Sequence, residues 1–392
     1  MLDFREKERI ENNTRDFSGR RKWLLVFMLG GMVLLAGRAI DLQVLNKHFL
    51  MEQGNIRHVA RVGVSAYRGK ILDRNGEPLA ISTPVQSIWM NPQEFAKKGK
   101  GIQSLKNVAK VLGISEAKVK NIVDPSSGRR FAYLKRKANP SEATKIKAMK
   151  LPGVYFEREF RRYYPYGEVT SHLVGFTNID DAGQEGLERN YESYLRGVPG
   201  SKRVIMDGKR QVIADVEEIQ PPVPGNDLVL SIDQKIQYSA YRELKAAVME
   251  HKAISGSLVV LDAKNGDILA AVNQPSFNPN TRKNLKGNRY RNRAITDVFE
   301  PGSTVKPFVV GCALDEGVIS RGYQTDTSPG WLRVGRNLVR DIHNYGKMDL
   351  TRILKKSSNV AVSEIALKMQ PKTFWECYNR LGFGESAGVG FP

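Results

Sequence analysis

The sequence predicts an α+β protein of about two or three domains, with a single helix near the N-terminus that is able to cross a membrane. Three observations lead to this expectation. Residues 23–37 are apolar and uncharged, residues 216–225 form a proline-rich connector, and strand and helix patterns occur on both sides of that connector. Of the 392 residues, 41% are hydrophobic, which is enough for ordinary buried cores.

The apolar segment follows a basic cluster at residues 20–22 and is expected to be a membrane anchor. Its fifteen uncharged residues are short for a membrane span of about 20 residues. The span covers residues 23–43 if Arg38 lies beside Asp41, three positions later, and extends its charged end toward the interface. A cleaved secretory signal is the alternative. The residues that follow make a poor cleavage site, so we expect an uncleaved anchor.

The basic cluster also sets the expected orientation. The positive-inside rule places residues 1–22 in the cytoplasm as a short tail and the chain after about residue 43 on the outer side. The tail carries seven basic and five acidic side chains, so +18 of the net charge of +20 lies beyond it, densely over residues 97–150 and 158–162. Anionic lipid headgroups and wall polymers are the expected counter-charges, and a solvated basic face is the simpler alternative. Nucleic acid is not expected as a partner outside the membrane.

Residues 44–225, between the anchor and the end of the connector, are expected to mix short strands with helices over residues 102–112 and 141–150. No catalytic group of residues stands out there. Ser115 precedes Lys118 by three positions, but it lies between two apolar-periodic runs. We interpret it as the N-cap of a short helix.

Residues 226–392 are expected to form a second domain. Asp233 predicts the N-cap of an amphipathic helix. Residues 257–262 and 267–272 predict two strands of a hairpin, joined through an Asn-Gly turn, and helices are expected to dominate residues 305–381. The apolar face of the first helix carries Ile236, Ala240, Leu244 and Val248.

Ser303 and Lys306 are the strongest candidates for chemistry. On a helix, residues three apart share a face, so the Lys306 amine can lie within reach of the Ser303 hydroxyl and take or hold its proton. Pro301 and Gly302 stand just before the serine, where a chain turns into a helix, and a helix N-terminus favours negative charge that develops there. This arrangement indicates an activated serine nucleophile.

A second hydroxyl and an amide follow at Ser357 and Asn359, on a tight connection between two expected helices. The amide can hold a peptide substrate by its backbone. Ser276 and Asn278 have the same spacing, but they lie in a loop where proline and asparagine suffice as turn residues. The order of the motifs along the chain therefore matters more than either spacing alone.

The two motifs resemble the first two active-site motifs of the penicillin-binding proteins and the serine β-lactamases. Further stretches resemble the class B penicillin-binding proteins, and two of them resemble the division-specific, FtsI-type branch of that class. The class B stretches are RGKILDRNG at residues 68–76, RYYPYG at residues 162–167 with His172 and Gly175, and GLE at residues 186–188 with Tyr191 and Leu195. The division-type stretches are EPGSTVKP at residues 300–307 and RDIHNYG at residues 340–346.

This resemblance implies an elongated mixed pedestal, or dimerisation-like, domain over residues 44–225. A penicillin-binding transpeptidase domain of the serine β-lactamase type would follow over residues 226–392. It implies a septal peptidoglycan D,D-transpeptidase of the inner membrane, with its bulk in the periplasm. The implied substrates are D-Ala-D-Ala stem peptides, β-lactams would bind in their place, and a septal glycosyltransferase and other divisome proteins would be partners.

The resemblance also implies roles for the four candidate residues. Ser303 attacks the D-Ala-D-Ala amide, Lys306 manages its proton, and Ser357 relays a proton to the leaving D-alanine. Asn359 positions the donor peptide.

The third motif of the family, Lys-Thr-Gly or Lys-Ser-Gly, does not occur after Asn359. The resemblance therefore implies a transpeptidase domain without its C-terminal part. In the family, the strand that carries this third motif supplies half of the oxyanion hole. The loss of one oxyanion donor costs about 100- to 1000-fold in rate. Three alternatives stay open: a catalytically impaired scaffold of the division machinery, an elongation-type class B protein, and a penicillin-sensing receptor. For a receptor, residues 1–22 are too short to hold a signalling domain.

Neither a metal nor a cofactor is expected, because the sequence has no metal-binding spacing and no phosphate-binding loop. Cys312 and Cys377 are too few for a disulfide framework and fit an oxidising compartment only weakly. Cys312 is expected to be a buried packing residue. His343 can be proposed as the base of a catalytic triad, but we expect a turn or core role, because Lys306 already supplies an amine.

Overall fold

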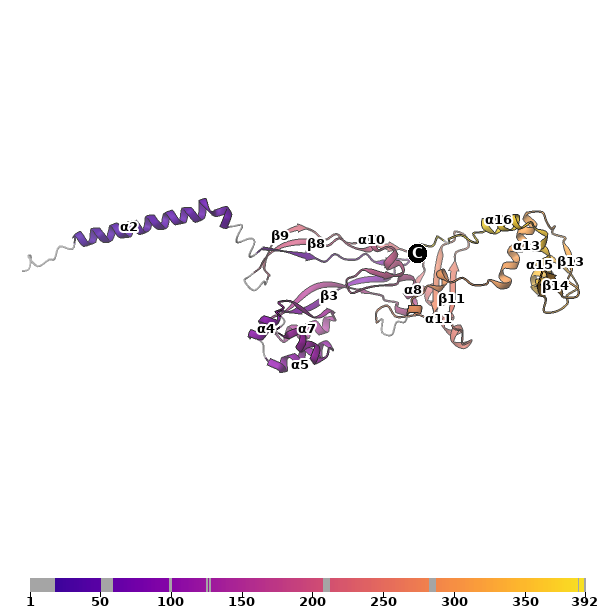
Figure 1. Cartoon of the computed structure of the whole chain (residues 1–392), viewed down its shortest axis with the longest axis horizontal. Helices are drawn as coiled ribbons and strands as arrows, with labels where there is room; N and C mark the ends of the chain where they lie inside the picture. Colours follow the sequence, from indigo (N-terminus) through magenta and orange to yellow (C-terminus); the bar gives the residue numbers. More distant parts are fainter. Residues whose placement is uncertain are drawn as a thin grey trace, which may run out of the picture. The chain divides into compact units, whose positions relative to one another are not determined.

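The computed structural model describes residues 18–50, 59–98, 101–124, 126, 128–206, 212–281, 287–386 and 388–390. The chain divides into two compact units, each assembled from several stretches of sequence (Figure 1). The first unit comprises Met1–Gly69, Ser82–Arg161 and Tyr194–Asp227, and the second comprises Lys70–Ile81, Arg162–Ser193 and Leu228–Pro392.

The N-terminal helix is long and apolar enough to cross a membrane over residues 19–45. It consists of α2 (Ser18–Ile40) and the π-helical turn η1 (Asp41–Leu45). Arg38 forms an ion pair with Asp41 at 2.5 Å, which confirms the pairing expected inside this segment. Most of the expected cytoplasmic tail lies outside the described residues.

The first unit contains a three-stranded antiparallel sheet in the order β1–β8–β9. Residues 216–220, which we expected in the connector, belong instead to β9 and pair with β8. The sequence VIADVEEI is rich in β-branched residues, and prolines begin only at Pro221, so nothing interrupts the strand earlier. The strands are β1 (Val59–Val64), β8 (Gly200–Met206) and β9 (Val212–Gln220).

A second part of the first unit packs helices on the end of a long strand, β3 (Pro78–Met90), and its neighbours β4 (Ala132–Ala138) and β5 (Val154–Tyr163). The helices are α4 (Pro92–Lys98), α5 (Gly101–Leu112), α6 (Glu116–Val123) and α7 (Pro140–Ala148). Their common core contains Ile88, Met90, Leu112, Val119, Leu134 and Ile146.

The helix ends of this part follow local sequence rules. Ser115 accepts a hydrogen bond from the Lys118 backbone N–H at 3.3 Å, which confirms that it is the N-cap of α6. Asn139 and Glu142 form a capping box at the start of α7. The helix therefore begins at Pro140, close to the expected start.

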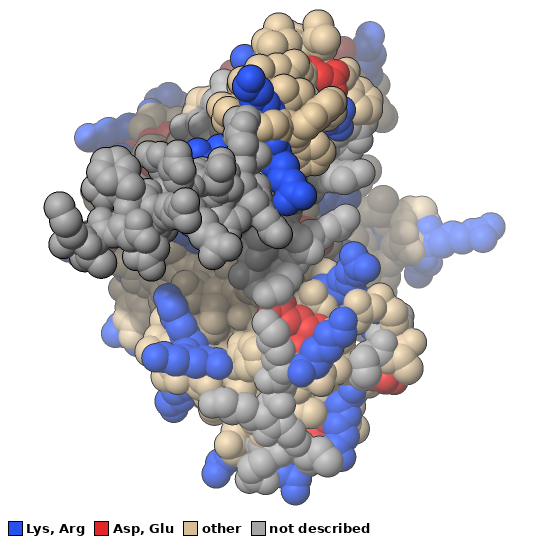
Figure 2. Space-filling view, turned by 90° about the vertical axis from the view of Figure 1, so that its left-hand side faces the viewer, with Lys and Arg blue, Asp and Glu red and all other residues tan. Residues whose placement is uncertain are grey.

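This part of the chain is strongly basic. Residues 97–150 alone carry 15 Lys and Arg against 3 Asp and Glu. The face shown in Figure 2 accordingly displays far more basic than acidic side chains. A Debye length of about 8 Å at physiological salt lets clustered charges of one sign act together on a nearby polyanion.

The second unit is held by a buried ion pair between two of the sequence motifs. The Arg162 guanidinium donates to the Glu188 carboxylate at 2.6 Å, and both side chains are almost completely buried. Gly186 allows the surrounding chain to pack closely. Its φ is +60°, and a Cβ there would lie 2.7 Å from the backbone nitrogen of Gly175. The short elements of this region are α8 (Ser171–Val174), β6 (Phe176–Thr177), β7 (Gly183–Glu185) and α9 (Gly186–Asn190).

The expected helix and hairpin of the second unit are both present. Asp233 accepts hydrogen bonds from the backbone N–H groups of Lys235 and Ile236, which confirms it as the N-cap. The helix packs on the antiparallel hairpin around Ala240 and Val272. The helix is α11 (Gln234–Glu250), and the strands are β11 (Gly256–Leu261) and β12 (Ile268–Gln274).

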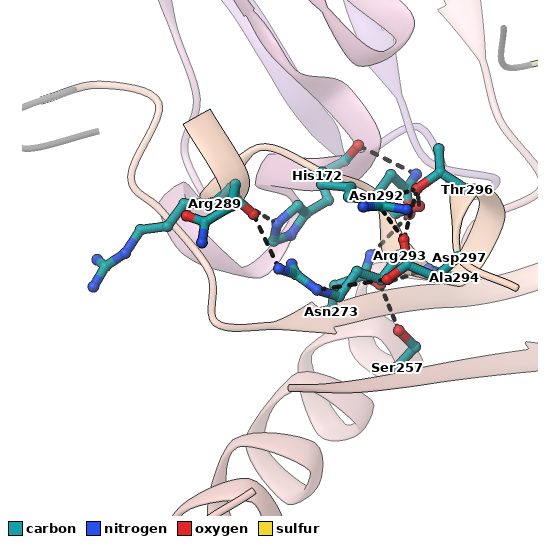
Figure 3. Close-up of polar contacts among 11 residues, drawn as sticks. His172, Ser257, Asn273, Arg289, Asn292, Arg293, Ala294, Thr296 and Asp297 are labelled. Carbon is teal, nitrogen blue, oxygen red and sulfur yellow. Dashed lines mark hydrogen bonds and ion pairs between the residues drawn. The ribbon is translucent and has the colours of Figure 1, made fainter. Parts of the chain in front are cut away.

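A buried polar cluster fixes the segment that follows the hairpin (Figure 3). Asn273 on β12 accepts hydrogen bonds from the Ser257 hydroxyl and the Ala294 backbone N–H, and its amide donates to Asn292 at 2.8 Å. The segment contains η4 (Gly287–Arg289) and α12 (Arg293–Thr296).

His172 on α8 contacts the same segment. Its Nε2 donates to the Arg289 carbonyl at 2.8 Å, and Phe277 packs edge-on against its ring. A cavity of about 190 Å³ lies beside it, lined in part by Tyr290 and Asn292.

The C-terminal part of the second unit is less purely helical than expected. Residues 324–349 form two short antiparallel ladders between the helices. The hairpin of β14 and β15 turns at Gly335, whose φ is +59°, a conformation that glycine adopts without a steric penalty. The strands are β13 (Gln324–Asp326), β14 (Trp331–Val334), β15 (Asn337–Arg340) and β16 (Lys347–Asp349). The helices are α13 (Lys306–Asp315), α14 (Leu350–Lys356), α15 (Asn359–Lys368) and α16 (Pro371–Arg380).

Cys312 is buried in the core, as expected, and it also forms a disulfide with Cys377, which we did not predict. The two residues are 65 positions apart, so only the packing of α13 against α16 brings them together, with a Cα–Cα distance of 6.0 Å. In the chain-entropy description, a crosslink that closes a loop of this length stabilises the fold by roughly 4 kcal/mol. Such a bond persists in an oxidising compartment.

His172 predicts a pH dependence of stability. Burial lowers its pKa to about 4, although the hydrogen bond to the Arg289 carbonyl opposes this. The neutral ring is therefore favoured in the folded state, and its contribution is complete above about pH 6.5 and is lost as the pH falls to about 4. We expect the melting temperature of the wild type to fall more steeply over this range than that of His172→Gln, whose amide can donate to Arg289 without titrating. Thermal melts at constant ionic strength measure both slopes, and equal slopes would contradict the assignment.

Candidate active site

Ser303 lies on an exposed turn at the start of a buried helix. The 3₁₀ turn η5 (Gly302–Val305) carries the serine, and α13 begins directly after it at Lys306. Gly302 has a φ of +60°, which allows the chain to reverse before the serine. Pro307 stands in the first turn of α13, where a helix needs no backbone donor. The serine hydroxyl is thus presented to solvent, while Lys306 is only 7% exposed.

The Lys306 ammonium uses all three of its donors on one connection between α14 and α15. It donates to the Ser357 carbonyl, to the Ser357 hydroxyl at 3.0 Å and to the Asn359 side-chain oxygen at 2.7 Å. A protonated lysine has three N–H donors, so its hydrogen-bonding capacity is filled. These contacts hold the first residue of α13 against the end of α14.

Ser357 connects the lysine to the candidate nucleophile. Its hydroxyl donates to the Ser303 hydroxyl oxygen at 2.8 Å while it accepts from Lys306. We expected the amine to reach Ser303 directly from the same helix face. The structure instead places Ser303 in a 3₁₀ turn, and the link from Lys306 to Ser303 runs through Ser357.

Ser357 also has an unusual backbone conformation. It ends α14 in the left-handed region, with φ +55° and ψ +45°. A non-glycine residue pays on the order of 1 kcal/mol there, and such conformations persist where the surroundings enforce them. Helix-ending bonds from the backbone N–H groups of Ser357 and Ser358 to the carbonyls of Leu354 and Ile353 hold this conformation, and the two hydrogen bonds from Lys306 add to them.

Asn359 begins α15 with both ends of its amide engaged. Its oxygen accepts from Lys306, and its nitrogen donates to the Arg340 carbonyl at 2.8 Å. The next residue in the chain from Arg340 is Asp341, which contacts residues 358–360. Asp341 was not among the predicted site residues, although it lies in the family-like stretch RDIHNYG that the sequence offered as a signal.

Burial and a neighbouring charge shift the pKa of Lys306 in opposite directions. Burial lowers the pKa of the amine, and the negative charge of Asp341 raises it. Burial is the larger effect, so the pKa lies below its ordinary value. A lowered pKa increases the fraction of neutral amine that can accept a proton near neutral pH.

The residues that share spacing with the candidates have structural roles. The Ser276 hydroxyl donates to the Glu168 carbonyl, and the Asn278 side chain accepts from the Asn280 backbone N–H. His343 is exposed and packs edge-on against Tyr345. Across the described ranges, no cluster of three or more His, Cys, Asp or Glu side chains is arranged to hold a metal ion.

The arrangement can therefore perform acyl transfer. An exposed hydroxyl stands at one end of a hydrogen-bonded chain, a second hydroxyl in the middle and a buried amine at the other end. Because hydroxyl groups both donate and accept, the chain can move a proton away from the serine or back toward it.

Comparisons with known proteins agree with this chemistry. Residues 63–230 match the model of the penicillin-binding protein dimerisation domain, and residues 256–392 match that of the penicillin-binding protein transpeptidase domain. The peptidoglycan D,D-transpeptidase FtsI of Escherichia coli K12 is 41% identical over 98% of this chain and 65% of its own length. The FtsI of Buchnera aphidicola from Baizongia pistaciae is 34% identical over 99% of this chain and 68% of its own.

A solved structure is similar as well. A peptidoglycan synthetase from Bifidobacterium adolescentis superimposes with a TM-score of 0.61 at 25% identity, covering 85% of this chain and 65% of that one. The chain belongs to the class B penicillin-binding proteins of the FtsI type. It spans 65% of the length of its Escherichia coli relative.

The left-handed conformation of Ser357 predicts how substitutions there affect stability. Ser357→Gly should be more stable than Ser357→Ala by on the order of 1 kcal/mol, because only glycine adopts this conformation without a steric cost. Ser363, within α15, provides a matched control. There alanine should be more stable than glycine by a similar amount, about 1 kcal/mol, because the backbone is helical. Chemical unfolding of the four variants measures both differences, and the same order at both positions would contradict the prediction.

Proposed function

We propose that this protein is a serine D,D-transpeptidase that cross-links peptidoglycan stem peptides during cell division. The observation that carries the proposal is the hydrogen-bonded chain from Lys306 through Ser357 to Ser303. Membership of the FtsI-type family supports the same reaction, since the relatives named above are peptidoglycan D,D-transpeptidases. β-Lactams are proposed to react with Ser303 in place of the stem peptide.

Acylation begins when the Ser303 oxygen attacks the carbonyl carbon between the two D-alanines. This step needs a neutral Lys306 and both hydroxyls turned, so that Ser303 donates to Ser357 and Ser357 donates to the lysine nitrogen. The Ser303 proton then passes to the Ser357 oxygen as the Ser357 proton passes to Lys306, which produces the ammonium and the donor directions of the resting chain. The tetrahedral intermediate then collapses, and the C–N bond to the terminal D-alanine breaks. Ser357 delivers its proton to the leaving amine and takes one from the Lys306 ammonium, so the lysine is neutral again.

Negative charge on the carbonyl oxygen develops next to the start of α13. The positive end of the helix dipole favours that charge, although the Lys306 backbone N–H already donates to the Ser303 carbonyl and Pro307 has no N–H. In the second half of the reaction, an amine of a neighbouring stem peptide attacks the acyl-serine. The amine loses its proton along the same chain, and Ser303 regains its hydroxyl as the cross-link forms.

Asn359 is proposed to position the donor peptide and to keep Lys306 in place. One amide N–H is used by the Arg340 carbonyl, and a second remains for a peptide carbonyl. The lysine contact supports the second role directly, because removal of that acceptor would leave a buried donor unpaired.

We further propose that the protein is a single-pass protein of the inner membrane, with its N-terminus in the cytoplasm and its bulk in the periplasm. The length of the apolar helix, the basic residues 20–22 and the Cys312–Cys377 disulfide support this orientation. The proposed division is a tail over residues 1–22, an anchor over 23–43, and pedestal and transpeptidase domains that meet at residue 225. A septal glycosyltransferase and other division proteins are proposed partners.

Ser303→Ala should abolish covalent labelling of the full-length protein by a fluorescent penicillin, because the attacking oxygen is lost. Ser115→Ala is the matched control, since this serine has the same spacing to a lysine but caps α6. It should label normally and lose about 0.5 to 2 kcal/mol of stability as a missing helix cap. Gel fluorescence after labelling separates the two variants, and labelling that survives Ser303→Ala would remove the nucleophile assignment.

A reporter that is active only outside the cytoplasm should be active when it is fused after residue 60. The anchor should remain attached to the mature chain. The same orientation exposes Cys312 and Cys377 to an oxidising compartment, so neither should react with an alkylating reagent before reduction. Mass spectrometry of the alkylated protein provides this second readout. A shortened soluble chain, or two free thiols, would count against the proposed topology.

A further inference from the structure

Asp341 makes more contacts with the candidate site than the end of a strand requires. It follows β15 directly, and its carboxylate reaches three successive residues of the connection before and within α15. One oxygen accepts from the backbone N–H groups of Asn359 and Val360, the latter at 3.0 Å, and the other accepts from the Ser358 hydroxyl at 2.7 Å. A charged acceptor makes hydrogen bonds roughly twice as strong as neutral ones.

These contacts are not needed to cap the start of α15. Ser358 is already the N-cap of α15, because its hydroxyl oxygen accepts from the Ala361 backbone N–H at 3.0 Å. Asp341 adds a second set of bonds from a residue 18 positions away from Asn359. It therefore fixes where the first turn of α15 lies with respect to the end of β15.

The backbone carbonyl of Arg340, the residue before Asp341, also holds Asn359. The Arg340 carbonyl accepts from the Asn359 amide nitrogen, so the amide oxygen points the other way, to Lys306. Arg340 and Asp341 together hold both the main chain and the side chain of Asn359. Ser357, two residues earlier, is thereby held at the position where its hydroxyl meets Ser303.

We propose that Asp341 is a positioning residue of the proposed reaction, which orients Ser357 and Asn359 on Lys306 through its bonds to residues 358–360. The inference rests on the proposed transpeptidase function of the same site. Asp341 does not touch Ser303, so it acts through the connection that it holds.

The carboxylate has a second consequence through its charge. Among the described residues, Asp341 is the charged group that acts on Lys306, since the groups that contact the amine, on Ser357 and Asn359, are neutral. Its field raises the pKa of the lysine against the effect of burial. Removal of the charge should therefore move the titration of Lys306 to lower pH.

Two substitutions separate geometry from charge. Asp341→Asn keeps an oxygen that can accept from the backbone of Asn359 and Val360 but removes the charge. Asp341→Ala removes both, and a displacement of the catalytic groups by about 1 Å can cost on the order of 100-fold in rate. Asp349→Asn is the matched control, because Asp349 caps α14 through a bond to the Arg352 backbone N–H and has no role in the site.

The experiment measures the second-order rate of acylation of the full-length protein by a chromogenic β-lactam from pH 6 to pH 10. In the resulting pH–rate profile, we expect the midpoint of the rise that follows the titration of Lys306 to move to lower pH in Asp341→Asn. In Asp349→Asn this midpoint should stay unchanged. We expect the plateau rate of Asp341→Ala to fall about 100-fold, as for a misplaced catalytic group, with folding checked by thermal melting. If Asp341→Ala does not fold, Asp341→Asn decides the test.

The possible outcomes distinguish a failure of this inference from a failure of the proposed function. A wild type whose Ser303 is not acylated would contradict the proposed function itself. If the wild type is acylated, a wild-type midpoint in Asp341→Asn, or a wild-type plateau in folded Asp341→Ala, would overturn the role of Asp341 alone.

Discussion

The buried ammonium of Lys306 is the constraint on which the candidate site depends. A cation removed from water must be paired or fully hydrogen-bonded, and this one finds all three acceptors on Ser357 and Asn359. The same contacts support the left-handed backbone with which Ser357 ends α14, and its hydroxyl donates to Ser303. One desolvated charge thus helps to set the geometry of two helix ends, while Ser303, Ser357 and Asn359 stay exposed around it.

The helices around this lysine are held by features far from it in sequence. Cys312 and Cys377 join α13 to α16, and the core between them includes Val309, Ile353 and Ile365. The lysine at the start of α13 therefore sits on a helix that is fixed both by packing and by a covalent bond. A rigid support of this kind is what a preorganised site requires, because small displacements of reacting groups are costly.

The motifs in the first part of the second unit serve structure in the same way. Arg162 and Glu188 come from two separate stretches and pair in the interior, where either charge alone would be expensive. His172 is kept neutral by burial and donates to a backbone carbonyl of the segment that precedes the active-site turn. Polar residues that look like catalytic candidates in a sequence can thus be paired buried groups that fix the path of the chain.

The sequence by itself determined the elements that depend on local rules. The caps at Ser115 and Asp233, the hairpin around Asn265 and Gly266, and the pairing of Arg38 with Asp41 all follow from neighbours within a few residues. The four candidate site residues were also chosen from local spacing, and the structure gathers them at one place.

Only the tertiary structure decided which of them touch. It joined Cys312 to Cys377 and Asp341 to residues 358–360, and it routed the link from Lys306 to Ser303 through Ser357. These contacts span 17 to 65 positions, and the packing of α13 to α16, which no local pattern encodes, creates them.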